Sequence, residues 1–324
     1  MKYQENKRFI FDGEKKYGIG FIVNYLKAFF NNFFFRILFY FRSPIVYDKK
    51  YRFSILSIFK NEAPYLKEFI EYHMLIGFEH FYLYNNNSDD NYKEVLQPYV
   101  DSGVVTLVEW PVVPGQGPMY DHWYVTYRHE SSWVSFLDLD EFICPLKVVS
   151  IAEWIKPFEK YPVIMLYWKM FGTNGHYEHD NNKLVTEQYI NSWEKISEIG
   201  KVIYNTDYDI AYFSKGMMHG FKVKLGKLNV PPINSFGYFV VAGIHRYKMN
   251  LTIQVNHYWS KAFGCYQKKH QRGSAVFGKS WKTFDQFLWH EHFNVSSDYS
   301  IYRFLMQLKL KMDGRYPQNE KTNE

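Results

Sequence analysis

The 324-residue sequence has only two cysteines, Cys144 and Cys265, and their positions match no zinc-ligand spacing. A disulfide-stabilised scaffold and a structural zinc site are therefore unsupported, and we expect a reducing compartment. No glycine-rich dinucleotide fingerprint and no Walker phosphate loop occur in the chain. The charged segment from Met1 to Lys16 lacks the layout of a cleavable secretory signal, so we expect an intracellular start.

The formal net charge of +6 is modest, and no recognition-helix or RNA-binding signature accompanies it. We therefore expect no nucleic-acid partner, whereas an anionic membrane surface or a phosphate-bearing substrate suits this charge. Aromatic residues are abundant instead, with 29 Tyr, 29 Phe and 9 Trp. Sugar stacking, a membrane-facing surface and a compositional bias all produce such a count, and composition alone does not separate them.

An aromatic stretch over residues 17–41 contains too many polar residues for a comfortable bilayer-spanning helix. On a helix these polar residues gather on one side: Asn24, Lys27, Asn31, Asn32 and Arg36. The apolar remainder includes Phe21, Ile22, Leu26, Phe29, Phe30, Phe33, Ile37 and Phe41. This pattern predicts a helix that lies in the membrane interface and ends before Pro44. The alternative is an aromatic helix that packs on the domain or on a second subunit.

From residue 51 onward, strand and helix patterns alternate. Strands are predicted at 53–59, 81–84 and 104–108. Helices are predicted from a first turn at Pro64 up to Gly77, and around 92–99. A further helix ends near Glu130, before an apolar strand, and another strand is predicted at 163–168. Such alternation is typical of an α/β protein with a mostly parallel sheet flanked by helices. We expect this domain to span 51–312, between an N-terminal aromatic segment (1–50) and a polar tail (313–324).

The apolar strand that begins at Trp133 runs into two carboxylates, Asp138 and Asp140, separated by one leucine. In an extended backbone these two side chains share a face, while Leu137 and Leu139 turn toward the core. Two carboxylates on one face are able to hold Mn²⁺ or Mg²⁺ together with a substrate diphosphate. Because an Asp-x-Asp sequence also occurs in ordinary turns, the spacing alone does not decide between these interpretations.

Several segments, in this order, resemble glycosyltransferases of the GT-A fold, and family 92 most closely. They are Ile58–Glu62, His73 with the following 75–77, Tyr84–Asp90 and Phe136–Phe142, then Trp168–Gly172 and His257–Lys261, followed by Lys269 and Arg272–Gly273. The resemblance covers roughly residues 53 to 273. It departs from the family pattern at Ala262, where a serine is usual, and between 201 and 257, which leaves the acceptor undetermined.

The resemblance implies a metal-dependent, inverting transfer of a sugar from a nucleotide-sugar, with UDP-galactose as the leading donor, to a hydroxyl of a glycan or glycolipid acceptor. Asp138 and Asp140 are the expected ligands of Mn²⁺ or Mg²⁺, and His257 is a third ligand or a diphosphate contact. The expected nucleotide-sugar contacts are Asn61, Glu62, Asp89, Asp90, Lys261, Lys269 and Arg272. Solvated surface and turn formation are the alternatives for these residues.

The general base is less clearly indicated. Asp180 is our choice because it follows the 171–176 loop, and Glu178, Asp207 and Asp209 are alternatives. We interpret 290–292, His-Glu-His, as surface because adjacent helical side chains diverge. The competing functions are a nucleotidyltransferase and a non-catalytic scaffold that binds glycans or membranes. Together the features suggest synthesis of a cell-surface polysaccharide or lipopolysaccharide, with the protein peripheral on the cytoplasmic face of the membrane.

Overall fold

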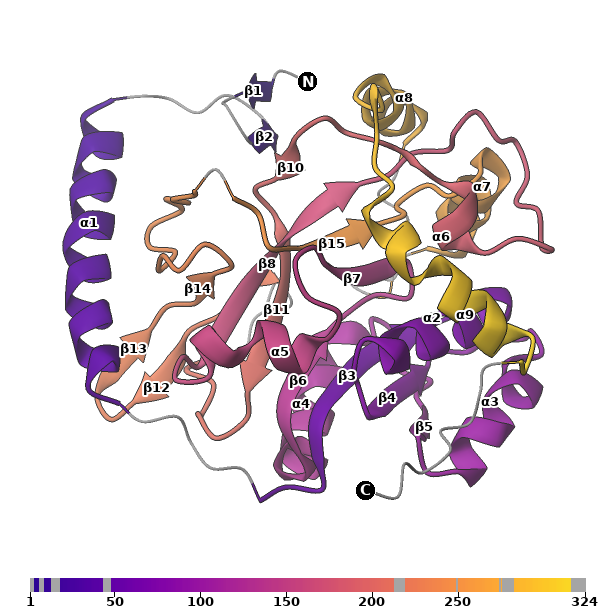
Figure 1. Ribbon diagram of the computed structural model, residues 1–324, viewed down its shortest axis with the longest axis horizontal. Coiled ribbons are helices and arrows are strands. Elements are labelled where there is room, and N and C mark those ends of the chain that lie inside the picture. The colour runs from indigo at the N-terminus through magenta and orange to yellow at the C-terminus, as the bar shows by residue number, and fades with distance from the viewer. Residues whose placement is uncertain are drawn as a thin grey trace, which may run out of the picture.

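The computed structural model describes residues 3–5, 9–12, 18–42, 48–212, 219–248, 250–273, 275 and 283–315. Its centre is one mixed sheet with the strand order β5-β4-β3-β6-β11-β8-β15-β7, and β14 pairs with β8 beside this path (Figure 1). These strands are β3 (Tyr51–Phe59), β4 (His80–Asn85), β5 (Val105–Glu109), β6 (Ser131–Phe136), β7 (Glu141–Pro145), β8 (Val163–Met170), β11 (Gly200–Asn205), β14 (Ile233–Asn234) and β15 (Ile253–His257). The sheet confirms the predicted α/β class.

The first half of the sheet is parallel and contains β5, β4, β3 and β6. The connections are the helices α2 (Ala63–Leu75), α3 (Tyr92–Asp101) and α4 (Gln116–Thr126). From Phe53 to Phe59 every residue of β3 is buried, as expected for a strand with both faces covered. Because β11 runs antiparallel to both β6 and β8, the second half of the sheet is mixed.

Helix α2 begins and ends where the sequence predicts. Pro64 lies in its first turn, where the missing N–H has no intrahelical partner to lose. After Leu75 the chain reaches Gly77, whose φ of 103° suits glycine, and the amide of Phe78 donates to the carbonyl of His73. This ending returns the chain to the sheet, where β4 pairs with β3.

A long helix, α1 (Ile19–Tyr40), lies along one side of the molecule, at the left of Figure 1. Its buried residues are Ala28, Asn32, Phe35 and Phe39. The Asn32 side chain donates to the carbonyl of Phe239 (2.9 Å) and accepts from the amide of the same residue (2.7 Å). No described helix is long and apolar enough to cross a membrane. The helix predicted for this stretch is thus present, whereas Pro44 lies outside the described residues.

Shorter elements complete the fold: β1 (Tyr3–Glu5), β2 (Phe9–Asp12), α5 (Ile151–Trp154), α6 (Val185–Gln188), β9 (Asn191–Ser192), β10 (Ile196–Ser197), β12 (Val223–Leu225), β13 (Leu228–Val230), α7 (Phe263–Arg272), α8 (Phe284–His292), β16 (Ser296–Ser297) and α9 (Leu305–Met312). Strand β2 pairs with β10, and α9 packs on α2. Of the predicted polar tail, only 313–315 is described.

Candidate active site

The acidic segment lies at one end of β6, where the chain turns back into β7. The amide of Glu141 donates to the carbonyl of Asp138 (3.0 Å), and the Glu141 carboxylate accepts from the amide of Asp138 (2.9 Å). Asp138 and Asp140 therefore belong to a turn, and our premise of an extended backbone is wrong. The prediction for the leucines is confirmed, because Leu137 and Leu139 are both buried in the core. Asp140 is also buried, whereas the Asp138 side chain is 37% exposed.

A buried lysine from β11 lies between two of these acids. The Lys201 ammonium group is 2.8 Å from Asp138 and 3.1 Å from Glu141. These two carboxylates raise the pKa of Lys201 despite its burial, so the lysine is charged. Gly200 allows this placement, because a Cβ atom there would collide with the carbonyl oxygen of Leu166 on β8.

Asp140 meets a histidine and a second lysine. His257 Nε2, at the end of β15, lies 3.7 Å from Asp140 Oδ2, and Lys269 of α7 donates to the same oxygen. Burial disfavours the charged carboxylate, but the Lys269 charge and His257 outweigh it and hold the pKa of Asp140 well below its usual value. Burial lowers the pKa of His257, which favours the neutral ring that binds metals. The His257 ring also packs on Trp168, with centroids 4.5 Å apart.

A third group of charges surrounds Glu62, just before α2. Its carboxylate is 3.1 Å from Lys261 and accepts from Arg272, which also donates to the carbonyl of Lys60. Burial alone raises the pKa of Glu62, but Lys261 and Arg272 lower it to about 2. Lys261 lies 3.4 Å from the centroid of the Tyr65 ring, a cation–π contact. Because α7 supplies both Lys269 and Arg272, one helix connects this group with Asp140.

The structure therefore brings together seven of the residues that the sequence proposes: Glu62, Asp138, Asp140, His257, Lys261, Lys269 and Arg272. They come from the loop between β3 and α2, the β6–β7 turn, the end of β15 with the segment after it, and α7, which are far apart in the sequence. Each carboxylate of this cluster has a cation beside it: Lys201 for Asp138, Lys269 for Asp140, and Lys261 and Arg272 for Glu62. Within the described part of the chain, no three His, Cys, Asp or Glu side chains converge as metal ligands. Asp140 and His257, 3.7 Å apart, are a pair of possible ligands.

These residues lie within a region that a family model matches. The model, described as glycosyltransferase family 92, covers residues 49–286. The chain belongs to glycosyltransferase family 92. Together with the observed sheet, this membership confirms the GT-A fold that we expected from the sequence.

Family 92 relatives in plants match a shorter segment. A protein of Oryza sativa subsp. japonica is 35% identical over 96 residues, and one of Arabidopsis thaliana is 34% identical over 94 residues. Each match covers 29% of this chain and only 16% of the relative, so the chain spans a small part of these longer proteins.

Solved structures show a partial likeness. The S. aureus TarS 1–349 structure is 17% identical with a TM-score of 0.33, over 48% of this chain and 47% of that one. Glucosyl-3-phosphoglycerate synthase from Mycobacterium tuberculosis, in complex with Mn²⁺, UDP and glucosyl-3-phosphoglycerate, is 14% identical with a TM-score of 0.29, over 48% of this chain and 57% of that one.

The acidic and amide residues after β3 and β4 join two loops of the fold. The side-chain oxygen of Asn61 accepts from the backbone amide of Asp89 (2.9 Å), and the backbone amide of Asn61 donates to the hydroxyl of Ser88 (2.9 Å). Asp90 accepts from the amide of Ala63 at the start of α2 (2.8 Å). These contacts give Asn61 and Asp90 a structural role, and nucleotide binding by them stays a prediction.

The four candidates for the general base lie in different surroundings. Asp180 is exposed and accepts from the amide of Asn182 (3.0 Å), as in a turn. Asp207 pairs with Lys49 and Asp209 with Arg128. The exposed Glu178 carboxylate lies against Gly264 in the first turn of α7, where the helix dipole favours negative charge. None of the four has a contact with Asp138 or Asp140 in the described structure.

Two expectations about individual residues change. His290 is buried, and Glu291 accepts from Thr173 (2.8 Å), so the interpretation of this segment as surface is wrong for both.

No role was predicted from the sequence for Lys201 or Glu141. The signal for Lys201 was a single charge inside the apolar run of β11, which indicates a buried and paired lysine.

Proposed function

We propose that this chain transfers a sugar from a nucleotide-sugar to a hydroxyl of a glycan acceptor, with inversion at the anomeric carbon. The observation that carries the proposal is the charged cluster around Asp140, which lies inside the matched family 92 region. Substrate diphosphates need cations, and Lys261, Lys269 and Arg272 supply three in one place. A UDP-sugar is the proposed donor, with UDP-galactose first.

A divalent metal fits the chemistry of the same residues. Asp140 offers a carboxylate oxygen and His257 a ring nitrogen, and both types of ligand suit Mn²⁺. Two side chains suffice for such a cation when water and phosphate complete its shell, and Asp138, two residues before Asp140 in the turn, is a further carboxylate. We propose that Asp138, Asp140 and His257 hold Mn²⁺ or Mg²⁺, which neutralises charge on the departing nucleotide.

The protein's own groups have separate tasks in this proposal. Lys269 and Arg272 contact carboxylates in the described structure, and we expect them to turn toward the donor phosphates when the donor is bound. Asp180 remains the proposed general base, and Glu178 is the alternative because it lies beside the same helix, α7. The acceptor would be a glycan or glycolipid of the cell surface, and the protein would work at the cytoplasmic face of the membrane.

The test is donor turnover with a panel of nucleotide-sugars, with Mn²⁺ and with a chelator, followed by mass analysis of the products. We expect free nucleoside diphosphate from one donor, only with metal present, and loss of this activity in Asp140→Asn. Release of a sugar 1-phosphate, which leaves when the nucleoside monophosphate is transferred, would instead indicate a nucleotidyltransferase. Binding without turnover of any donor would favour the non-catalytic scaffold. Asp101→Asn, a change of an exposed aspartate on α3, is the matched control.

A further inference from the structure

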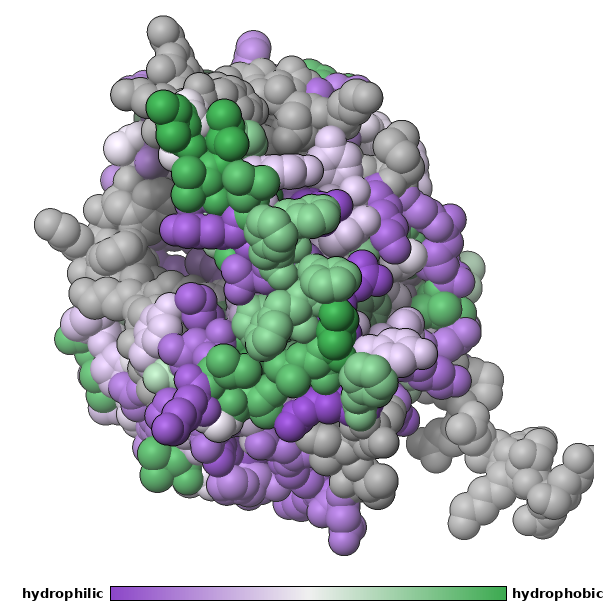
Figure 2. All heavy atoms as spheres, turned by 90° about the vertical axis from the view of Figure 1, so that its left-hand side faces the viewer, coloured by the Kyte–Doolittle hydropathy of each residue, from purple (hydrophilic) through white to green (hydrophobic). Residues whose placement is uncertain are grey.

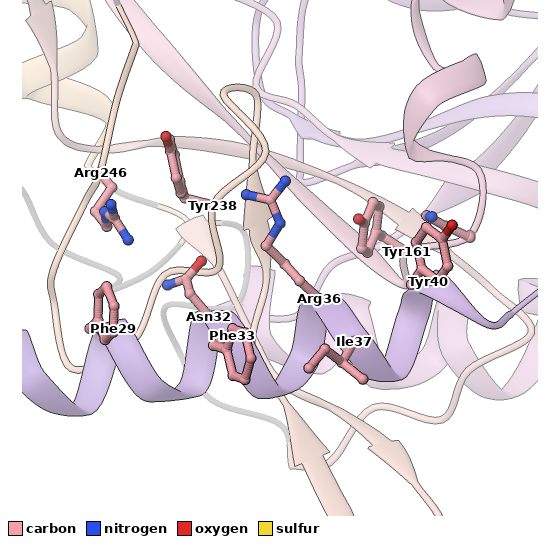
Figure 3. Close-up of a pocket in the computed structure, with 10 residues that line it drawn as sticks. Phe29, Asn32, Phe33, Arg36, Ile37, Tyr40, Tyr161, Tyr238 and Arg246 are labelled. Atoms are coloured by element: carbon pink, nitrogen blue, oxygen red, sulfur yellow. The ribbon is translucent and has the colours of Figure 1, made fainter.

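A groove of about 600 Å³ runs between α1 and the domain (Figure 3). Its lining consists of Phe29, Asn32, Phe33, Arg36, Ile37, Tyr40, Lys160, Tyr161, Tyr238 and Arg246. Three of these side chains are cations, and none is an acid. In Figure 3 the Arg36 side chain rises from α1 into the space between Tyr238 and Tyr161. The groove is therefore a cationic and aromatic site.

The three cations have no carboxylate partner among the described residues. Lys160 lies 5.7 Å from the ring centroid of Tyr161, and Arg246 lies 4.6 Å from that of Tyr238. Most basic residues of the candidate active site, in contrast, have an acid beside them. Unpaired cations that converge on one groove indicate an anionic ligand.

The groove opens onto a broad apolar surface. Phe29, Phe33 and Ile37 line the groove and are also 50%, 66% and 46% exposed. The exposed hydrophobic residues continue along α1: Ile19, Ile22, Val23, Leu26, Phe30 and Phe34. Figure 2 shows this apolar band with hydrophilic side chains along its sides. Between residues 18 and 42 there is no Asp or Glu.

We propose that this side of the molecule docks on a lipid bilayer that contains anionic phospholipids. The apolar face of α1 would lie among the acyl chains, and Arg36, Lys160 and Arg246 would hold a lipid phosphate in the groove. Tyrosines beside the cations suit the headgroup level, where an aromatic body meets a polar boundary. This inference deepens the membrane attachment in the proposed function by naming the lipid class and the residues that bind it.

A second copy of the chain fits this face poorly. In a two-fold dimer the same patch meets itself, so the cations of one groove would face those of the other. Like charges across a contact are unfavourable, and no acid is among the residues that line the groove. An anionic membrane satisfies both the apolar band and the cations at the same time.

The experiment measures binding of the full chain to vesicles by co-sedimentation, without any donor. Neutral phosphatidylcholine vesicles are compared with vesicles that also contain phosphatidylglycerol. We expect stronger binding to the anionic vesicles. The triple variant Arg36→Gln/Lys160→Gln/Arg246→Gln should lose that preference, by roughly fivefold for each cation removed. Phe30→Ser/Phe33→Ser, which changes exposed side chains, should weaken binding to both kinds of vesicle.

The control is Lys93→Gln/Lys147→Gln/Arg315→Gln, which removes the same number of charges outside the groove and should bind like the parent. Equal binding of the parent chain to both vesicles, or equal losses in the two triple variants, would overturn the proposal. A concentration-dependent dimer that Phe30→Ser/Phe33→Ser dissociates, with no vesicle binding, would overturn it in favour of a second copy. Donor turnover is measured separately, in solution without vesicles or detergent. A chain that turns over its donor but does not prefer anionic vesicles would contradict the membrane proposal alone and leave the transferase proposal intact.

Discussion

His257 Nε2 lies 3.7 Å from Asp140 Oδ2, although the two residues are more than a hundred positions apart in the sequence. The pairing of β15 with β7 causes this proximity, because His257 lies opposite Glu141 in the antiparallel register. Asp140 is the residue before Glu141, so the turn brings its carboxylate back toward the histidine. The sheet itself therefore positions both groups, and no mobile loop is needed to bring them together.

Asp140→Asn should reduce sugar transfer at least a hundredfold, because a neutral amide neither binds a divalent cation well nor balances Lys269. The size and shape of the side chain are retained, so the melting temperature should change less than the activity. Initial rates with the preferred donor measure the effect, and Asp101→Asn serves as the control. Retention of full activity by Asp140→Asn would remove this residue from the site.

His257→Gln should weaken Mn²⁺ binding about 10- to 100-fold, because the replacement removes a ring nitrogen beside Asp140. Calorimetric titration of Mn²⁺ in the presence of UDP gives the affinity directly. His292→Gln, at an exposed position on α8, is the control and should bind Mn²⁺ like the parent. An unchanged affinity in His257→Gln would exclude the histidine as a ligand.

Lys201→Met should lower the free energy of unfolding by about 3–5 kcal/mol, because it leaves Asp138 and Glu141 without their shared cation. Urea unfolding measures the loss. The double variant Lys201→Met/Glu141→Gln should recover part of it, because the buried carboxylate becomes neutral. Lys93→Met, at an exposed lysine, should stay within about 0.5 kcal/mol of the parent. A Lys201→Met protein as stable as the parent would show that the ion pairs of Lys201 with Asp138 and Glu141 contribute little to the free energy of unfolding.

The first half of the fold was accessible from the sequence because its signals are local. Apolar runs such as that of β3, Pro64 in the first turn of α2 and Gly77 after its end each depend on near neighbours. The pairing of β11 between β6 and β8 depends on contacts across the chain, and no local pattern in this irregular region predicts it.

The site was predictable only in part for the same reason. The ordered motifs pointed to Asp138, Asp140, His257 and Lys269, and the structure places them together. The error about the extended backbone arose because the side chain of Glu141 bonds the amide of Asp138 and closes a turn. Lys201 lacked a motif, since its role depends on acids about sixty residues earlier.

Acid should destabilise the protein through His73. Burial lowers the pKa of His73 to about 3, and both ring nitrogens have backbone partners, the carbonyl of Phe69 and the amide of Ile143. The unfolded value is about 6.5, so the stability from the neutral ring is complete above that pH and declines as the pH falls toward 3. When the pH falls from about 7 to about 5, protonation of His73 in the unfolded chain should lower the free energy of unfolding by about 2 kcal/mol.

Urea unfolding at the two pH values tests this dependence. In His73→Gln the decline should be smaller by that amount, whatever the stability of the variant at neutral pH. His292→Gln should keep the slope of the parent. An identical slope in all three proteins would mean that His73 does not titrate in this range.

Asn32→Ala should lower the free energy of unfolding by about 1–3 kcal/mol, because the amide and the carbonyl of Phe239 both lose their partner. Asn31→Ala is a matched control on the same helix, since the exposed Asn31 bonds only the carbonyl of Lys27. Urea unfolding gives the energy, and limited proteolysis shows whether α1 becomes accessible. Because Asn32 is a buried polar contact between α1 and the domain, its loss should expose α1 to cleavage before the sheet unfolds. Equal behaviour of the two variants would mean that the aromatic contacts of Phe35 and Phe39 hold the helix in place on their own.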